Sequence, residues 1–217
     1  LCDALYGRVG EGRFVLGARG LSVEKALGGY SLCYTAPNGA ACTIHADRII
    51  TTVGSYELRS MLPFIPLDTL DQIDNLLYAR VVEVTLGFRH WSGMPLGGFG
   101  GLIPSVEGRN LLGILFMSSL FQDRAPDGGA LLTVFMGGAR RADLLDIDDE
   151  SIRRIVQTEC TELLGIADYK PELISVVRHV NAIPQYGVES GVRFEAIARV
   201  EQQNEGLFIG GNPHGGI

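Results

Sequence analysis

The sequence predicts a mixed α+β fold, in which a largely antiparallel sheet with flanking helices is inserted into an α/β unit. The prediction rests on the order of the patterns. Short apolar strand patterns fill residues 13–52, longer ones fill residues 79–138, and a clear amphipathic helix follows at 148–165 before the chain returns to strand and helix. This order is typical of a sheet domain carried by an α/β domain.

The first third of the chain alternates short strands with short helices. A helix is expected at residues 1–9, and "APNG" at 36–39 predicts a hairpin turn. The regular spacing of apolar residues predicts further helices at 55–62 and 66–77. The strands are expected at residues 13–16 ("RFVL"), 21–26 ("LSVEKA"), 30–35 ("YSLCYT") and 41–52 ("ACTIHADRIITT").

The middle and the end of the chain carry the strongest patterns. In the helix at 148–165, Ile152, Val156 and Cys160 mark one apolar face, and Asp148 suits the N-terminus. A loop is expected at "IPQYG", 183–187, and a helix at 191–203. Strands are expected at residues 79–88, 98–104, 111–119, 131–138, 172–180 and 206–211.

Composition excludes several classes of function. The net charge of −7 without a long basic run gives no nucleic-acid footprint, and the chain has no run of 18 apolar residues that would span a membrane. The four cysteines lack metal-site spacing and predict reduced core thiols, and the four histidines are scattered, so no metal site is expected. No hydrolase motif occurs in the sequence.

Three glycine-rich stretches are candidates for ligand contacts. "GLFIGGNPHGGI", 206–217, follows an apolar strand, and small residues there would let backbone N–H groups approach a cofactor. "GFGGLIP" and "VFMGGAR" place apolar side chains beside glycines, as the smooth walls for a flat ligand would require. From spacing alone, ordinary turns and sheet core are the simpler interpretation of all three. The start at Leu1 and the ending on this loop lead us to expect a fragment of a longer protein.

Together these stretches resemble a known family. "GFGGLIPSVE", "LLGILFMSSLFQDRAPDGGALLTVFMGGAR", "IPQYG" and "GLFIGGNPHGG" are similar, in order, to the C-terminal half of oxygen-dependent protoporphyrinogen oxidases, within the monoamine-oxidase-like flavoproteins. The resemblance implies partial segments of a Rossmann-like FAD domain at 1–55 and 200–217, and a substrate-binding domain at 56–199. Because the chain lacks a GxGxxG motif, we expect that it does not hold FAD tightly by itself.

The resemblance also implies an activity and a substrate pocket. The family dehydrogenates a porphyrinogen (protoporphyrinogen IX or coproporphyrinogen III) at FAD, and dioxygen reoxidises the flavin, so no catalytic side chain is expected. Phe99, Gly100 and Leu102 would form one pocket wall and Leu115 the opposing wall. Leu102 and Leu115 would sandwich one pyrrole ring, and Phe135 would stack on another.

On the flavin side, the resemblance assigns cofactor contacts to Gly20, Gly211 and Asn212. The sequence departs from the family pattern at Gly20, at Gly54 and at residues 187–190, whereas the pocket motifs are intact. Two alternatives therefore stay open: another flavin amine oxidase-like dehydrogenase, or a porphyrin-binding module without catalysis. The preference between the two porphyrinogens is left open as well. The resemblance is compatible with a cytoplasmic protein, with peripheral membrane association and with a homodimer.

Overall fold

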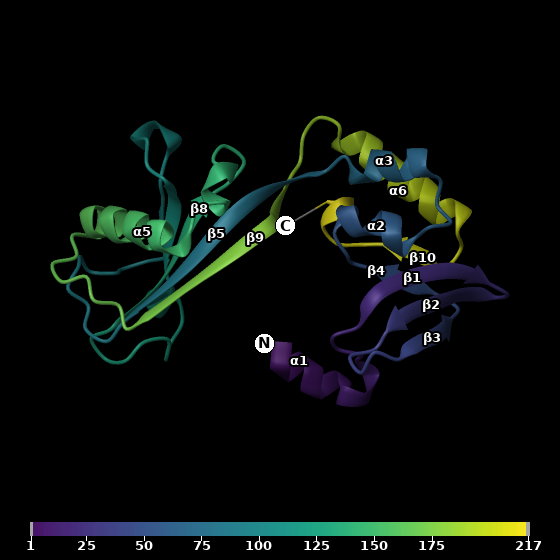
Figure 1. The fold of residues 1–217 in the computed structure, drawn as a ribbon, viewed down its shortest axis with the longest axis horizontal. Coiled ribbons are helices and arrows are strands. Elements are labelled where there is room, and N and C mark those ends of the chain that lie inside the picture. Colours follow the sequence, from purple (N-terminus) through teal and green to yellow (C-terminus); the bar gives the residue numbers. More distant parts are fainter. Residues whose placement is uncertain (1, 216–217) are drawn as a thin grey trace. The chain divides into compact units, whose positions relative to one another are not determined.

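The computed structural model describes residues 2–215, which form two compact units (Figure 1). Unit 1 consists of Leu1–Leu76 together with Tyr186–Ile217, and unit 2 consists of Leu77–Gln185. In the sequence, unit 2 is thus inserted between the two segments of unit 1. The expected domain boundaries, after residues 55 and 199, both fall inside unit 1. The assignment of FAD and substrate domains to the two units stays a prediction.

Unit 1 combines two small sheets with helices. One sheet is antiparallel in the order β1-β2-β3, and β10 pairs with β4 in parallel. No helix of residues 2–215 is long and apolar enough to cross a bilayer. The elements of unit 1 are α1 (Cys2–Val9), η1 (Glu11–Arg13), β1 (Arg19–Ala26), β2 (Gly29–Thr35), β3 (Ala41–Ala46), β4 (Ile49–Thr51), α2 (Ser55–Met61), α3 (Leu67–Asp74), α6 (Ser190–Gln203), β10 (Leu207–Ile209) and η4 (Asn212–His214).

Two of the expected strands in unit 1 are wrong. Residues 13–16 form no strand, because the chain leaves η1 at Arg13 and then turns at residues 16 and 17. The single strand expected at 41–52 is two strands, because β3 pairs with β2 up to Ala46, whereas β4 pairs with β10 from Ile49 onward. The break at Asp47 and Arg48 lets the chain change from one sheet to the other.

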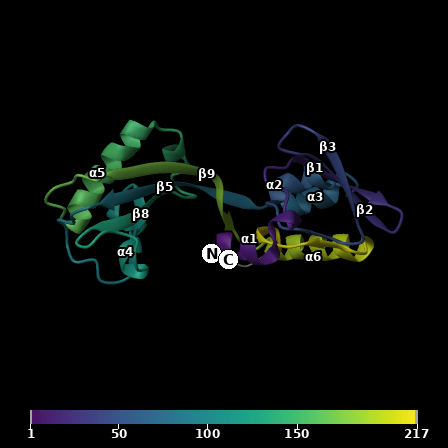
Figure 2. The ribbon, with the colours of Figure 1, turned by 90° about the horizontal axis from the view of Figure 1, so that it is seen from below.

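The core of unit 1 lies where its helices meet the parallel strand pair. Leu58 of α2, Ile73 of α3, Ile197 of α6 and Leu207 of β10 are all at most 1% exposed and belong to one apolar cluster. α3 and α6 come from segments far apart in the sequence, and Figures 1 and 2 both show them in the same part of unit 1. Packing between distant segments therefore assembles this unit.

Unit 2 is built on a five-stranded antiparallel sheet in the order β6-β7-β8-β5-β9. β5 and β9 run side by side along the unit in both views (Figures 1 and 2). The elements of unit 2 are β5 (Leu77–Phe88), β6 (Gly100–Leu102), η2 (Ser105–Glu107), β7 (Leu111–Phe116), α4 (Met117–Leu120), β8 (Ala130–Gly137), η3 (Ala142–Leu145), α5 (Asp149–Leu164) and β9 (Leu173–Gln185).

The helix expected at 148–165 is confirmed, including both of its ends. The Asp148 side chain accepts a hydrogen bond from the Ser151 N–H, and Gly165 ends the helix in the left-handed conformation with φ of 59°. Ile152, Val156 and Cys160 are 0% exposed and pack on the sheet. The apolar face read from the sequence is therefore the face that covers the sheet.

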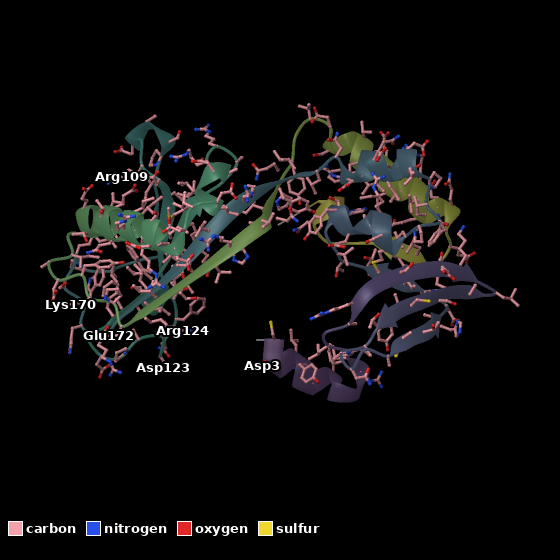
Figure 3. The ribbon with its side chains drawn as sticks, viewed as in Figure 1. Asp3, Arg109, Asp123, Arg124, Lys170 and Glu172 are labelled. Atoms are coloured by element: carbon pink, nitrogen blue, oxygen red, sulfur yellow. The ribbon has the colours of Figure 1, made fainter. Side chains whose placement is uncertain are left out.

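A buried carboxylate ties α5 to the start of β7. Glu159, 8% exposed, accepts hydrogen bonds from the backbone N–H groups of Asn110 (3.0 Å) and Leu111 (3.2 Å). Near it, Arg109 forms an ion pair with Glu162 on α5 (2.8 Å; Figure 3 labels Arg109). These contacts anchor the helix over one end of the sheet.

Two local predictions in unit 2 are corrected. Residues 117–119, expected at the end of a strand, begin α4 instead. Residues 183–185, expected in a loop, belong to β9, because Ile183, Pro184 and Gln185 lie opposite the first residues of β5. The partner strand supplies the pairing that the local sequence did not predict.

Candidate functional site

The sheet of unit 2 has one covered and one open face, because successive strand residues point to opposite sides. The covered face packs on α5 and includes Val82, Val84 and Leu86, all 0% exposed. We call the other side the open face. The strand register sets two adjacent rows on it, each crossing the strands in the order β6-β7-β8-β5-β9. They are Leu102-Gly113-Phe135-Glu83-Val177 and Gly100-Leu115-Thr133-Thr85-Ser175.

The structure brings four of the five expected substrate residues onto the open face. Leu102 and Phe135 lie in the first row with only Gly113 between them, and Gly100 and Leu115 are direct partners in the second row. Leu102 is 87% exposed, so its side chain is available to a ligand. The resemblance placed these residues in one pocket, and the strand register now gives them one common surface.

Two glycines lie beside the two leucines on this face, and we call the place between Leu102 and Leu115 the Leu102–Leu115 slot. Each leucine faces a glycine across the strand pair, so that Leu102 and Leu115 are diagonal neighbours. The Cα atoms of diagonal neighbours in a sheet lie about 7 Å apart. A flat ring needs about 3.5 Å to each side for van der Waals contact. The two positions are far enough apart for one aromatic ring only when the Leu102 side chain, whose Cδ2 atom lies 3.1 Å from the place of a Gly113 Cβ, turns away.

Gly100 is required by the backbone that forms this slot. Its φ is +127°, and a Cβ built there would lie 2.0 Å from the Ile114 carbonyl oxygen. No other residue fits this conformation and this approach without moving β6. The glycine of the motif therefore has a structural reason that is separate from any contact with a ligand.

Phe99 is the fifth expected substrate residue. It lies one residue before β6, its carbonyl accepts a hydrogen bond from the Phe116 N–H, and it is 75% exposed. The positive φ of Gly100 interrupts the regular alternation at this point, so the register does not assign the Phe99 side chain to the open face. Its expected role stays a prediction.

Beyond Phe135 the open face becomes polar. Glu83 lies directly opposite Phe135 on β5, and the His179 Nε2 atom of β9 lies 3.6 Å from the Glu83 carboxylate. Thr85 and Ser175 continue the polar half in the second row. No motif of the sequence marks Glu83 or His179. The available signal was a single glutamate at an alternating position in the apolar strand "VVEVTLGF".

A hollow of about 480 Å³ lies at the β5 end that carries Gly87. Leu131 and Leu173 flank Gly87 on the neighbouring strands. Arg124 and Glu172, labelled in Figure 3, also line the hollow. None of the residues expected to bind the substrate lines it. An apolar floor beside a guanidinium group suits a ligand that carries a carboxylate.

In unit 1, the expected flavin loop follows the parallel pair of β4 and β10. Ligands of α/β sheets bind beyond the carboxyl ends of parallel strands, and this loop begins there. Gly211 has φ of +79°, and a Cβ on it would lie 3.2 Å from the Thr52 carbonyl oxygen. Together with Asn212 and His214 it lines a hollow of about 380 Å³. The fold explains Gly211 by its close approach to Thr52, and the contact of Gly211 and Asn212 with a flavin stays a prediction.

Aromatic and charged side chains hold this loop in place. The Tyr186 hydroxyl donates to the Asn212 carbonyl oxygen (3.0 Å). Arg193 is 2% exposed, and its guanidinium carbon lies 5.8 Å from the ring centroid of Tyr186 and 5.7 Å from that of Phe194. Its guanidinium also donates to the Asn75 carbonyl oxygen (3.2 Å). No sequence pattern predicts these contacts, because the residues come from segments that meet only in the fold.

Gly20, the third expected cofactor residue, lies elsewhere in unit 1. It occupies an irregular position of β1, where the pairing with β2 shifts between Arg19 and Ser22, and its φ is +60°. That strand belongs to the three-stranded sheet and not to the β4–β10 pair. The fold explains Gly20 as a backbone requirement, and its contact with a cofactor stays a prediction.

Comparison with known proteins decides the family. The family described as "Flavin containing amine oxidoreductase" matches residues 1–215. The chain belongs to this family. Membership confirms the predicted flavoprotein class and implies FAD as the cofactor.

Among curated proteins, the chain is 30% identical to mitochondrial protoporphyrinogen oxidase of Nicotiana tabacum over 233 residues, which cover 100% of this chain and 45% of that protein. It is 31% identical to the chloroplastic protoporphyrinogen oxidase of the same species, with 100% and 41% covered. It is 27% identical to coproporphyrinogen III oxidase of Bacillus subtilis (strain 168), with 72% and 33% covered. The chain thus spans less than half the length of these relatives.

Among solved structures, a protein of Exiguobacterium sp. 255-15 described as a protoporphyrinogen oxidase superposes with a TM-score of 0.71 at 19% identity. The match covers 90% of this chain and 42% of that one. A reduced UDP-galactopyranose mutase superposes with a TM-score of 0.64 at 14% identity and covers 81% and 37%. At these identities the matches concern the fold, and they confirm the predicted α+β class.

Proposed function

We propose that the chain is part of an FAD-dependent oxidase that dehydrogenates a porphyrinogen to the porphyrin with dioxygen as the oxidant. The open face of unit 2 would bind the macrocycle. The observation that carries this proposal is the placement of Leu102, Leu115 and Phe135 on one face, with glycines opposite both leucines. Relatives named as protoporphyrinogen and coproporphyrinogen oxidases support the porphyrinogen class of substrate.

The side chains of this chain would bind and orient the macrocycle. Leu102 and Leu115 would hold one pyrrole in the slot between them, and Phe135 would stack on a neighbouring ring, which fixes the macrocycle's orientation. The backbone at Gly211 and Asn212 would approach the flavin. FAD, when bound, supplies the oxidation chemistry. Cytoplasmic location, peripheral membrane association and a homodimer remain expectations from the resemblance.

Replacing the stacking aromatic residue tests this assignment in the full-length protein. We expect Phe135→Ala to lower kcat/KM on a porphyrinogen by about 5-fold or more, because an aromatic contact contributes about 1 kcal/mol beyond its buried area. Phe121→Ala removes an exposed aromatic ring elsewhere in unit 2 and serves as the control. Equal turnover of the Phe135→Ala variant and the wild type would show that the open face does not bind the substrate.

The departures on the flavin side favour a second candidate, a porphyrin-binding module without catalysis. Gly54 is the N-cap residue that precedes α2, and a Cβ there would lie 2.3 Å from the Tyr56 ring, so local packing gives this glycine a structural reason as well. Flavin absorbance of the purified full-length protein separates the candidates. A colourless protein that still binds porphyrin would support the module. A yellow protein that leaves porphyrinogens unoxidised in air would support another flavin amine oxidase-like dehydrogenase.

A further inference from the structure

Glu83 is a charged residue in the middle of the proposed binding face. It lies in the same row as Leu102 and Phe135, between Phe135 on β8 and Val177 on β9. Its side chain is 35% exposed, so the sheet shields about two thirds of it from water. A carboxylate is an uncommon choice for a half-buried position between an aromatic and an aliphatic residue.

The carboxylate of Glu83 has unused capacity to accept hydrogen bonds. Within residues 2–215 its partner is the His179 imidazole, whose Nε2 atom lies 3.6 Å from the nearer oxygen. That distance allows an electrostatic interaction but is too long for a hydrogen bond. A half-buried carboxylate with open acceptor positions is stabilised by a ligand that brings N–H donors. The face therefore offers an acceptor directly beside the stacking ring.

A porphyrinogen carries the matching donors. Each of its pyrroles has an N–H group, and its saturated bridging carbons let the rings tilt, so that the N–H groups can converge on an acceptor at one side of the macrocycle. A porphyrin is conjugated and flat, and its remaining N–H groups point into the centre of the ring. A ring stacked on Phe135 would place its N–H edge within one strand spacing of Glu83.

We propose that Glu83 is a specificity-determining residue that accepts hydrogen bonds from pyrrole N–H groups and so favours porphyrinogen over porphyrin on the open face. The His179 imidazole lies beside this carboxylate on the neighbouring strand. The inference rests on the proposed function and deepens it, because it names the feature by which the face distinguishes the reduced from the oxidised macrocycle. Oxidation flattens the ring and withdraws the donors from Glu83, which favours release of the product.

The test is a binding experiment on the full-length protein under nitrogen, with the flavin reduced beforehand by dithionite so that no turnover occurs. Calorimetric titrations with protoporphyrinogen IX and with protoporphyrin IX give the two affinities. We expect Glu83→Gln to weaken porphyrinogen binding about 10-fold or more, since hydrogen bonds to charged groups are among the stronger ones. Porphyrin binding should change by less than about twofold. Glu150→Gln on α5, away from the open face, is the matched control.

The outcomes separate the inference from the proposed function. If Glu83→Gln weakened the binding of both macrocycles equally, the inference would be overturned. Glu83 would then contribute to the binding face without distinguishing the reduced from the oxidised macrocycle. No effect of Glu83→Gln, with Phe135→Ala weakening both ligands, would overturn it as well and leave the proposed function standing. If the wild type binds neither macrocycle, the proposed function fails. Because glutamine has nearly the shape of glutamate, an unchanged urea midpoint is expected and checks that the variant is folded.

Discussion

The two faces of the unit 2 sheet use the same strands for different purposes. On the covered face, Val82, Val84 and Leu86 are 0% exposed against α5, and burial there raises the pKa of the Cys160 thiol to about 12. On the open face, neighbouring positions of the same strand are Glu83 and Thr85, and both are half-buried. Fold stability depends on the covered face, whereas the open face can carry glycine, charge and exposed leucine without loss of the core.

The first prediction tests how much the covered face contributes to stability by placing a charge in it. Val84→Asp would bury a carboxylate without a partner, and we expect it to destabilise the protein by about 4 kcal/mol or more. Urea unfolding followed by the fluorescence of Trp91, the single tryptophan, measures this, because Trp91 packs on the core of unit 2. Thr85→Asp, one residue further along the strand, should cost less than about 1 kcal/mol. Similar losses in the two variants would mean that the faces do not differ as described.

The second prediction concerns the anchor of the covering helix. Glu159→Ala leaves the backbone N–H groups of Asn110 and Leu111 without their acceptor, which should cost about 2–4 kcal/mol. The same urea experiment measures the loss. Glu162→Ala, which removes only the ion pair with Arg109, should have a much smaller effect. A comparable loss in both variants would contradict the role given to Glu159.

The third prediction tests whether water or a hydrogen-bond acceptor reaches the buried position of Cys160 on the covered face. Cys160, 0% exposed, is replaced by Ser or by Ala. Cys160→Ser should destabilise the protein by about 1–2 kcal/mol, because it buries a hydroxyl group in an apolar cluster. Cys160→Ala brings in no polar group and should cost less. A serine variant as stable as the alanine variant would show that water or a backbone acceptor reaches this position.

The smallest expected effect is at the start of α5. The Asp148 carboxylate accepts hydrogen bonds from the Ser151 N–H (2.8 Å) and hydroxyl (3.0 Å), which lower its pKa below the ordinary value of 3.8. A carboxylate with a lowered pKa in the folded state stabilises the fold above its unfolded value, and this contribution is lost as the pH falls through the folded value. Asp148→Asn should therefore lower the urea midpoint slightly at pH 7, and the difference should disappear in strong acid. A difference that persists in acid would mean that the charge has no part in the cap.

The resemblance selected four residues of the open face without any structure. Gly100, Leu102, Leu115 and Phe135 came from motif stretches, and the register places all four on one side of the sheet. Glu83 and His179 were not selected, because no motif marks them and their meaning depends on strands that are far apart in the sequence. A lone glutamate in an apolar strand became informative only when its cross-strand neighbour was known to be Phe135.

The sequence by itself determined the local elements of this protein. The apolar spacing of 148–165, the cap at Asp148 and the left-handed Gly165 define α5 through contacts within one segment. Tertiary structure decided the pairing. It divided β3 from β4, drew residues 183–185 into β9 and aligned the rows of the open face. The physical reason is that caps and periodicity act through neighbouring residues, whereas strand register depends on hydrogen bonds between distant segments that form together with the core.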